Sequence, residues 1–144
     1  MNHANLPKGS VYDQYTWPEI RDLQKVDRVA VIPVSAVEQH GLHLPLDTDE
    51  VLVWSVCTEA TKRAPEDIVL LPLVPYGICE MTGGYPGTIS ISPETLHKLS
   101  DRAESGRGVA IASIEFPFLN RSKYLTRRWV NSLILYSPPA QNSR

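Results

Sequence analysis

The chain has 144 residues, of which 42% are hydrophobic and 21% are charged, and its formal net charge is −2. These values are typical of a globular domain and exclude a fibrous or fully disordered protein. The small net charge argues against a dedicated nucleic-acid-binding protein, and no apolar run approaches the roughly 18 residues that a membrane span needs. Because there are two isolated cysteines and no signal-peptide pattern, we expect a cytoplasmic protein that binds neither nucleic acid nor membrane.

The first part of the chain predicts a leader, a short helix and a buried strand. Residues 1–15 show no hydrophobic periodicity and are expected to form the leader. Thr16 and Glu19 have the spacing of a capping box, so a helix should begin there. The β-branched run at residues 29–34 is typical of a strand buried on both faces of a parallel sheet. Because Pro33 has no N–H to donate, this strand should lie at a sheet edge or end near that residue.

The next segments predict a loop, a helix and a second strand. Residues 35–49 lack periodicity and form the loop, which lies at the carboxyl end of the first strand. Residues 50–64 are helical by composition. The expected inner face of this helix consists of Val53, Val56, Cys57 and Ala60. Residues 68–71 are apolar throughout and predict a second buried strand.

A third pair of segments completes the pattern. Residues 79–88 form a glycine-rich loop, and residues 89–91 are a short extended piece. Ser92 can cap a following helix, in which Leu96 and Leu99 should point inward. The repeated order of strand, loop and helix predicts the α/β class with a layered, parallel sheet. In such sheets a functional site usually lies at the carboxyl ends of the strands.

The chain changes character after about residue 100. Residues 1–100 contain seven Lys and Arg against thirteen Asp and Glu, a balance of −6, whereas residues 101–144 contain seven against three, a balance of +4. We therefore divide the chain into a leader (1–15), an α/β part (16–100) and an atypical basic tail (101–144). A sheet of two strands leaves an edge and apolar faces exposed, and residues 109–114 or 129–136 could supply a covering strand.

One loop concentrates groups that bind metal ions. Residues 38–49 contain three carboxylates and two imidazoles. Glu38 and His40 are two residues apart, so in an extended segment their side chains point to the same side, and Asp49 lies at the start of the next helix. Nitrogen and carboxylate ligands suit zinc, manganese or nickel. The alternative is a solvated loop in which Asp47 or Asp49 caps the helix and His43 is a surface residue.

Residues 38–49 read Glu-Gln-His-Gly-Leu-His-Leu-Pro-Leu-Asp-Thr-Asp, and this segment resembles the signature of the creatininase (creatinine amidohydrolase) family. The resemblance extends over roughly residues 14–100. Further similar landmarks are residues 16–19, 31–34, 71–77 and 85–90. The resemblance implies an α/β/α fold with a mostly parallel sheet, of which the C-terminal half is missing here.

The resemblance also implies a two-metal hydrolase that opens cyclic or linear amides of small molecules, and an oligomer of identical chains is compatible with it. Glu38 would bind one ion, His40 the other, and Asp49 would bridge them, with zinc or manganese as the metals. His43 matches a signature position and is expected to support the ligands from behind, although it could simply pack. The resemblance identifies no catalytic residue.

Two departures from the family pattern bear on activity. The family takes its remaining ligands from a later Asn-Gly-His segment and an acidic residue behind it, yet no histidine follows His97. Met81 stands where many relatives carry histidine. We therefore predict a creatininase-like metal-dependent amidohydrolase that is truncated. The alternative is an inactive piece of that fold, which acts as a binding or structural unit or arises from a disrupted reading frame.

Other candidate sites have weaker support. The loop that contains Gly83, Gly84 and Tyr85 lacks the spacing and lysine of a phosphate-binding loop, so we interpret it as a substrate-side loop or a plain turn. Cys57 is expected in the core, and Cys79 is a bystander because no base lies near it in the sequence. The basic residues of the tail are more typical of a solvated segment than of a nucleic-acid interface.

Overall fold

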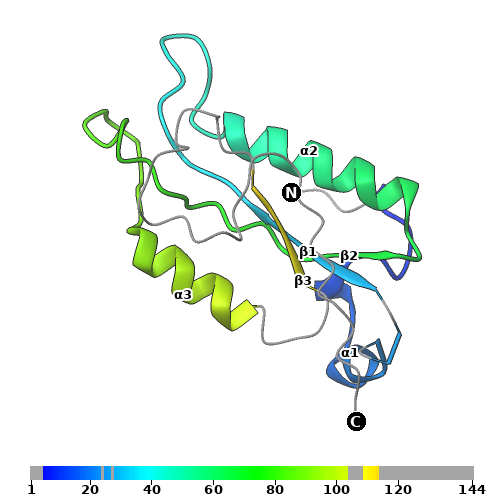
Figure 1. The fold of residues 1–144 in the computed structure, drawn as a ribbon. Helices are drawn as coiled ribbons and strands as arrows, with labels where there is room; N and C mark the ends of the chain where they lie inside the picture. The colour runs from blue at the N-terminus through cyan, green and yellow to red at the C-terminus, as the bar shows by residue number, and fades with distance from the viewer. Residues whose placement is uncertain (1–4, 24, 27, 104–108, 114–144) are drawn as a thin grey trace.

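The computed structural model describes residues 5–23, 25–26, 28–103 and 109–113. A 3-10 helix at Tyr12–Gln14 precedes the regular elements. These elements are, in chain order, α1 (Trp17–Leu23), β1 (Val29–Val34), α2 (Thr48–Arg63), β2 (Ile68–Leu70), α3 (Pro93–Ala103) and β3 (Val109–Ser113). Figure 1 shows the strands between α2 and α3, which is the layered α/β arrangement that the sequence predicts.

The described strands form one parallel sheet in the order β2-β1-β3. In the register, Val29 pairs with Ile68 and Val34 pairs with Ser113. The prediction of a covering strand within residues 109–114 is therefore confirmed, because β3 lies along the free edge of β1. The other candidate, residues 129–136, lies outside the described residues.

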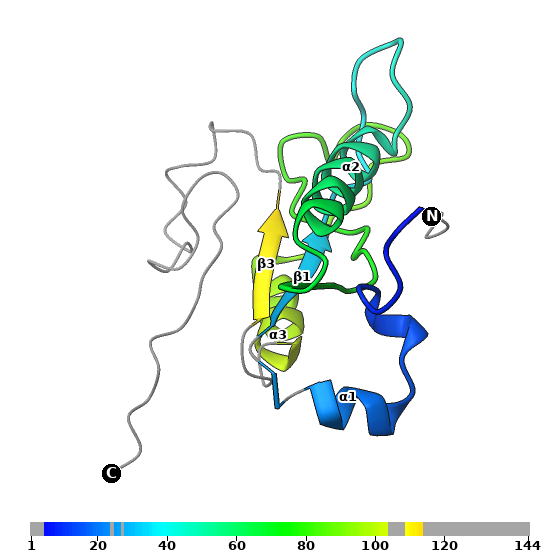
Figure 2. The same ribbon diagram turned by 90° about the vertical axis from the view of Figure 1, so that its right-hand side faces the viewer.

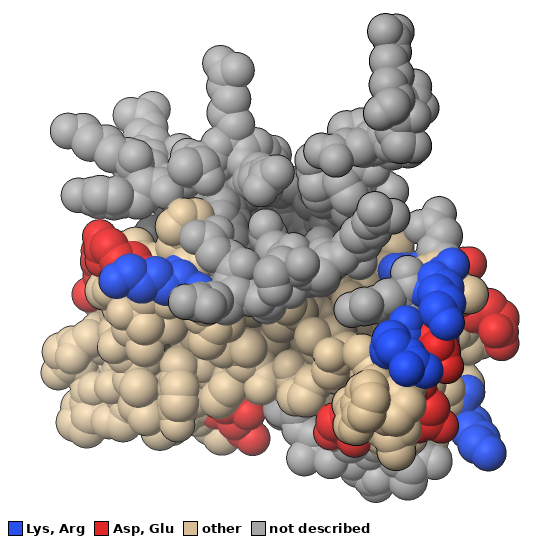
Figure 3. All heavy atoms as spheres, turned by 90° about the horizontal axis from the view of Figure 1, so that it is seen from below, with Lys and Arg blue, Asp and Glu red and all other residues tan. Residues whose placement is uncertain are grey.

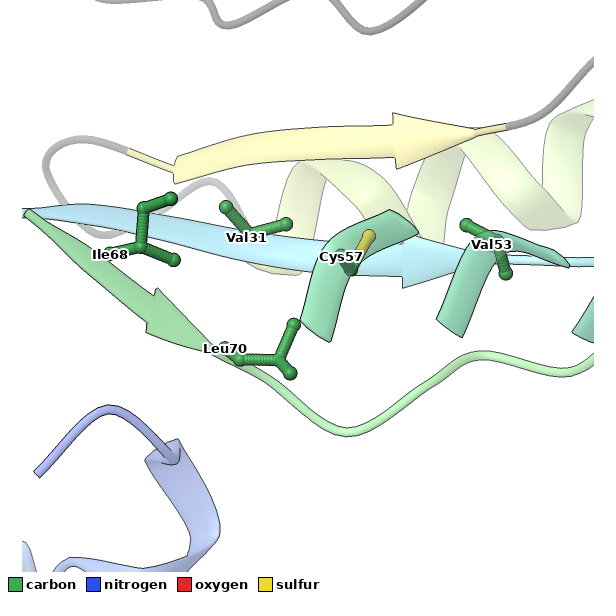
Figure 4. Close-up of a cluster of buried hydrophobic side chains, with 5 residues drawn as sticks. All are labelled: Val31, Val53, Cys57, Ile68 and Leu70. Carbon is green, nitrogen blue, oxygen red and sulfur yellow. The ribbon is translucent and has the colours of Figure 1, made fainter. Parts of the chain in front are cut away.

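The two faces of the sheet have separate cores. On one face, Val31 of β1 packs with Val53 and Cys57 of α2 and with Ile68 and Leu70 of β2 (Figure 4). On the other face, the buried cluster consists of Ile32, Val34 and Leu96, the last from α3. Because successive residues of β1 serve opposite faces, its continuous apolar run is explained by burial on both sides.

The position of β1 corrects one of the two options for Pro33. β1 is the central strand of the described sheet, so the expectation of an edge is wrong, whereas the end of the strand at Val34 is confirmed. The Val74 N–H donates to the Pro33 carbonyl oxygen at 2.9 Å, so this side of the Pro33 backbone faces the segment that follows β2. β2 already ends at Leu70, and the missing N–H of Pro33 therefore interrupts no ladder.

The segment expected to be a leader contributes to the fold. Ser10 is 0% and Val11 2% exposed, and Val11 forms a parallel bridge with Leu70. The Arg28 guanidinium donates to the Gly9 carbonyl oxygen at 2.8 Å and to the Ile68 carbonyl oxygen at 2.6 Å. This side chain therefore joins the N-terminal segment to the start of β2. Such a long-range contact leaves no periodic pattern in the sequence, so the sequence did not predict it.

Helices α1 and α3 begin at the capping residues that the sequence predicts, but the inner faces of α2 and α3 differ from the prediction. Before α1, the Thr16 N–H and hydroxyl both donate to the Glu19 carboxylate, at 2.7 and 2.6 Å. The buried residues of α2 are Asp49, Val53, Cys57 and Thr61, a strict i, i+4 row. Val56, expected on that face, is 41% exposed, and in α3 Leu96 is buried while Leu99 is 40% exposed. These two inward assignments are wrong because the sheet contacts a narrow stripe of each helix.

The surface shows no segregation of charge on the face drawn in Figure 3, where basic and acidic side chains of the described residues lie next to one another. Asp22 forms ion pairs with Lys25 at 2.7 Å and with Arg21 at 3.4 Å. Within the described part of the chain, no helix has the length and apolar character needed to cross a membrane.

Candidate metal centre

The candidate ligands lie at the carboxyl end of the sheet. β1 ends at Val34, and the chain then forms a long loop before α2 begins at Thr48. In Figure 2 the arrowheads of β1 and β3 point toward this loop and toward the loop between β2 and α3. Glu38 and His40 lie on the first loop, and Asp49 is the second residue of α2. The parallel topology therefore places them where α/β proteins bind their ligands.

The structure brings Glu38, His40 and Asp49 together. One ligand atom from each lies within 4.8 Å of the others, and this is the one such group of three or more His, Cys, Asp or Glu residues among the described residues. His40 Nε2 is 3.2 Å from Asp49 Oδ1, and His40 Nδ1 is 3.0 Å from the Glu38 carbonyl oxygen. A carbonyl oxygen only accepts, so Nδ1 carries a proton and Nε2 is the nitrogen directed at the carboxylates.

The charges of this cluster are only partly balanced. Asp49 is 6% exposed, and this burial, reinforced by the Glu38 charge, raises the pKa of Asp49 even though the neighbouring His40 acts to lower it. Burial acts to lower the pKa of His40, but the Glu38 carbonyl and the Asp49 charge outweigh it and raise that pKa overall. In a simple ion pair with His40 the pKa of Asp49 would be lowered, whereas here it is raised. Two carboxylates share one imidazole, and a divalent cation would complete the balance.

The capping alternative does not describe Asp49. Asp47 occupies the N-cap position of α2, and its side chain makes no capping hydrogen bond. Asp49 lies inside the first turn and directs its carboxylate to His40 instead. The burial of the Asp49 side chain is therefore explained by its contact with His40 and not by a capping role at the start of α2.

A second loop, between β2 and α3, contacts the first, and the sequence did not predict these contacts. The Thr82 hydroxyl donates to Glu38 Oε2, and the Gln39 N–H donates to the Thr88 hydroxyl oxygen at 3.2 Å. The Ile89 N–H donates to the Val37 carbonyl oxygen at 2.9 Å. Thr82 and Glu38 are separated by 44 residues in the chain. Contacts over such a distance cannot be predicted from the spacing of neighbouring residues.

Two glycines allow the loops to reach these positions. Gly41, directly after His40, has a φ of 75°, a left-handed conformation that favours glycine. A Cβ atom on Gly77 would lie 2.6 Å from the Ser35 carbonyl oxygen, so a side chain there would push the second loop away from the first. The approach of the loops therefore depends on a missing side chain at residue 77.

The remaining predicted site residues do not belong to the group of three candidate ligands. His43 is exposed and makes no hydrogen bond to Glu38, His40 or Asp49 among the described contacts. Gly83, Gly84 and Tyr85 are exposed on the second loop, directly after Thr82. Cys79 is 3% exposed, and burial, together with the Glu38 and Asp49 charges, raises the pKa of its thiol to about 11. A thiol that stays protonated at neutral pH is a poor nucleophile.

Comparison with known proteins finds sequence similarity over most of the chain. The sequence model of the Creatininase family, described as creatinine amidohydrolase, matches residues 13–105. A mycofactocin precursor peptide peptidase from Mycolicibacterium smegmatis is 35% identical over 104 residues, which cover 69% of this chain and 41% of that protein. A creatinine amidohydrolase from Pseudomonas putida is 31% identical over 97 residues, which cover 63% of this chain and 36% of that protein.

Solved creatininases have a similar fold. A crystal structure of creatinine amidohydrolase superposes with a TM-score of 0.61 at 27% identity and covers 74% of this chain and 45% of that one. Two similar structures, each 25% identical, are titled as a Zn-Zn form and a Mn form of creatininase, with TM-scores of 0.61 and 0.59. The chain thus spans about two fifths of the length of the curated relatives that it matches.

Proposed function

The chain belongs to the creatininase (creatinine amidohydrolase) family, and from this premise we propose that it binds a divalent metal ion. We further propose that it hydrolyses an amide C–N bond. The two kinds of named relative, a creatinine amidohydrolase and a peptide peptidase, both cleave such bonds. The proposed substrate class is therefore a small molecule or short peptide that contains an amide.

The observation that carries the proposal is the convergence of three candidate ligands, two carboxylates and one imidazole, at one point. Asp49 is buried beside His40 Nε2, and Glu38 completes a group whose ligand atoms lie within 4.8 Å of one another. Carboxylate and imidazole donors are the set that zinc and manganese take in proteins. The metals named for similar solved structures, zinc and manganese, agree with this donor set.

The roles of the residues follow from their places. Glu38, His40 and Asp49 would together hold one ion, and His40 keeps Nε2 available because its Nδ1 donates to the Glu38 carbonyl oxygen. When bound, a divalent ion supplies polarisation of an amide carbonyl and lowers the pKa of water. The part of the chain that the structure describes contains one group of three such ligands. We therefore propose that the chain by itself binds one ion per copy.

A second candidate function rests on the same observation. With one group of three ligands in the described residues, the chain could bind the ion without turning over substrate, and would then act as a binding or structural unit of this fold. The two candidates share the metal site and differ only in catalysis, so metal binding and hydrolysis must be measured separately.

The test compares the metal content of three proteins. Purified wild type, His40→Ala and His43→Ala are loaded with Mn²⁺ or Zn²⁺, desalted and analysed for metal. His43 provides a matched control because it lies on the same loop, is exposed and stands outside the cluster. We expect about one ion in wild type and in His43→Ala, and little in His40→Ala. Equal metal in all three proteins contradicts the assignment.

Catalysis is tested on the same preparations. Wild type with added Mn²⁺ or Zn²⁺ is incubated with creatinine and with short peptides, and release of the amide-cleavage products is followed by mass spectrometry. Turnover that is lost in His40→Ala supports the hydrolase. Metal binding without turnover of either substrate class supports the non-catalytic alternative.

A further inference from the structure

We infer that Thr82 is a positioning residue of the metal centre and that its hydroxyl fixes the Glu38 carboxylate in the orientation that faces Asp49 and His40. The inference rests on the proposed metal-binding function and deepens it. It concerns a residue of the second loop that belongs to no sequence motif and to no ligand set described above.

The hydroxyl of Thr82 has two acceptors within reach, and the carboxylate is the better one. Thr82 Oγ1 contacts Glu38 Oε2 closely, while the Cys79 carbonyl oxygen lies 3.4 Å away. A hydroxyl has a single hydrogen to donate, and a bond to a charged acceptor is shorter and stronger than one to a neutral carbonyl. The hydrogen therefore lies on the bond to Glu38, which uses one lone pair of Oε2.

Thr82 is itself held by the backbone of its loop. The Thr82 N–H donates to the Cys79 carbonyl oxygen at 3.2 Å, and the Tyr85 N–H donates to the Thr82 carbonyl oxygen at 3.0 Å. The Cys79 N–H in turn donates to the Ser90 hydroxyl oxygen at 2.8 Å. These bonds involve no ligand, so the donor is in place before a cation arrives.

The consequence for metal binding follows from the flexibility of Glu38. A glutamate has several side-chain torsions, and here its carboxylate also experiences the charge of Asp49 nearby. With Oε2 bound to Thr82, the side chain is ordered in advance and the carboxylate keeps further lone pairs for a cation. Partners of this kind behind a ligand typically contribute about tenfold to a hundredfold in metal affinity.

The effect of the Thr82 hydroxyl on Glu38 can be tested separately from the other contacts that join the two loops. The loops are also joined by the bond from the Gln39 N–H to the Thr88 hydroxyl and by the bond from the Ile89 N–H to the Val37 carbonyl. Neither of these bonds touches a ligand carboxylate. Thr88→Val therefore removes a threonine hydroxyl that accepts a hydrogen bond from the first loop without touching Glu38, and it is the matched control for Thr82→Val.

The experiment measures metal affinity in wild type, Thr82→Val, Thr82→Ser and Thr88→Val. Titration with Mn²⁺ by calorimetry gives the affinity, and the visible spectrum of a Co²⁺-loaded sample reports the geometry at the ion. We expect Thr82→Val to bind Mn²⁺ about tenfold to a hundredfold more weakly with an altered Co²⁺ spectrum. Thr82→Ser, which keeps the hydroxyl, should restore both, and Thr88→Val should resemble wild type.

Different outcomes overturn different statements. If wild type binds no metal, the proposed function fails and the inference fails with it. If wild type binds metal and folded Thr82→Val binds it equally well with an unchanged spectrum, the inference alone is overturned. An equal loss in Thr88→Val also overturns it, because the effect would then belong to the attachment of the loops. If Thr82→Val does not fold, Thr82→Ala is judged by the same criteria.

Discussion

Replacement of Asp49 by asparagine should separate the stability of the metal-free protein from its response to metal. Asp49 is 6% exposed, and its pKa is raised by burial and by Glu38. The folded state therefore favours the neutral carboxyl of Asp49. The stability that this carboxyl contributes is present at pH values below its ordinary pKa of 3.8 and is lost as the pH rises through the raised pKa of the folded state. Asp49→Asn, neutral at every pH, should raise the stability of the metal-free protein at pH 7 and remove this part of the pH dependence.

The response to metal should change in the opposite sense. With free metal at 100 times the dissociation constant, wild type gains about 2.7 kcal/mol of unfolding free energy. For a chain of this size that gain corresponds to a rise in Tm of roughly 10 °C. Removal of one of three ligands should weaken binding by at least about a hundredfold, and the same metal concentration would then add only about 0.4 kcal/mol.

The assay is thermal unfolding followed by circular dichroism between pH 4 and 8, with chelator or with Mn²⁺. The expected pattern is a crossing, in which the variant is the more stable protein with chelator and the less stable one with saturating Mn²⁺. A variant that is stabilised by Mn²⁺ as much as wild type would refute the ligand assignment of Asp49. A variant that is no more stable than wild type with chelator would refute the electrostatic argument.

Three further predictions concern the fold that supports the site. Leu70 is 0% exposed within the core between β2 and α2, so Leu70→Ala should lower the unfolding free energy by about 2–5 kcal/mol in urea titrations. Gly77→Ala places a Cβ atom against the Ser35 carbonyl oxygen, and it should weaken Mn²⁺ binding in calorimetry by moving the second loop. Arg28→Met removes the bonds to Gly9 and Ile68, and it should lower stability by about 1–3 kcal/mol and speed limited proteolysis near the N-terminus.

The elements of local origin could be predicted from the sequence. The β-branched run of β1 is buried on both faces as expected, since a central strand of a layered sheet packs against a helix on each side. The convergence of Glu38, His40 and Asp49 was also expected, because two of them share one side of an extended segment and the third begins the next helix.

Features that depend on distant segments could not be predicted in this way. For Pro33 the sequence left two options, a sheet edge or a nearby strand end, and it could not decide between them because the answer depends on where the neighbouring strand β2 ends. Val11 has no periodic neighbours, and its burial arises from pairing with Leu70. The contact between Thr82 and Glu38 spans 44 residues and depends on the approach of two loops.

The proposed metal centre adjoins the sheet core because both use the buried row of α2, so metal binding would be coupled to folding. Asp49 and Val53 belong to one buried row of α2, in which Asp49 faces the candidate ligands and Val53 packs on Val31 of β1. Glu38 and His40 follow directly from the end of β1. A cation held by these three residues therefore ties the end of β1 to the start of α2 and stabilises the contact that forms the core. Because all three candidate ligands come from this single connection, the site needs only β1, α2 and the second loop to assemble.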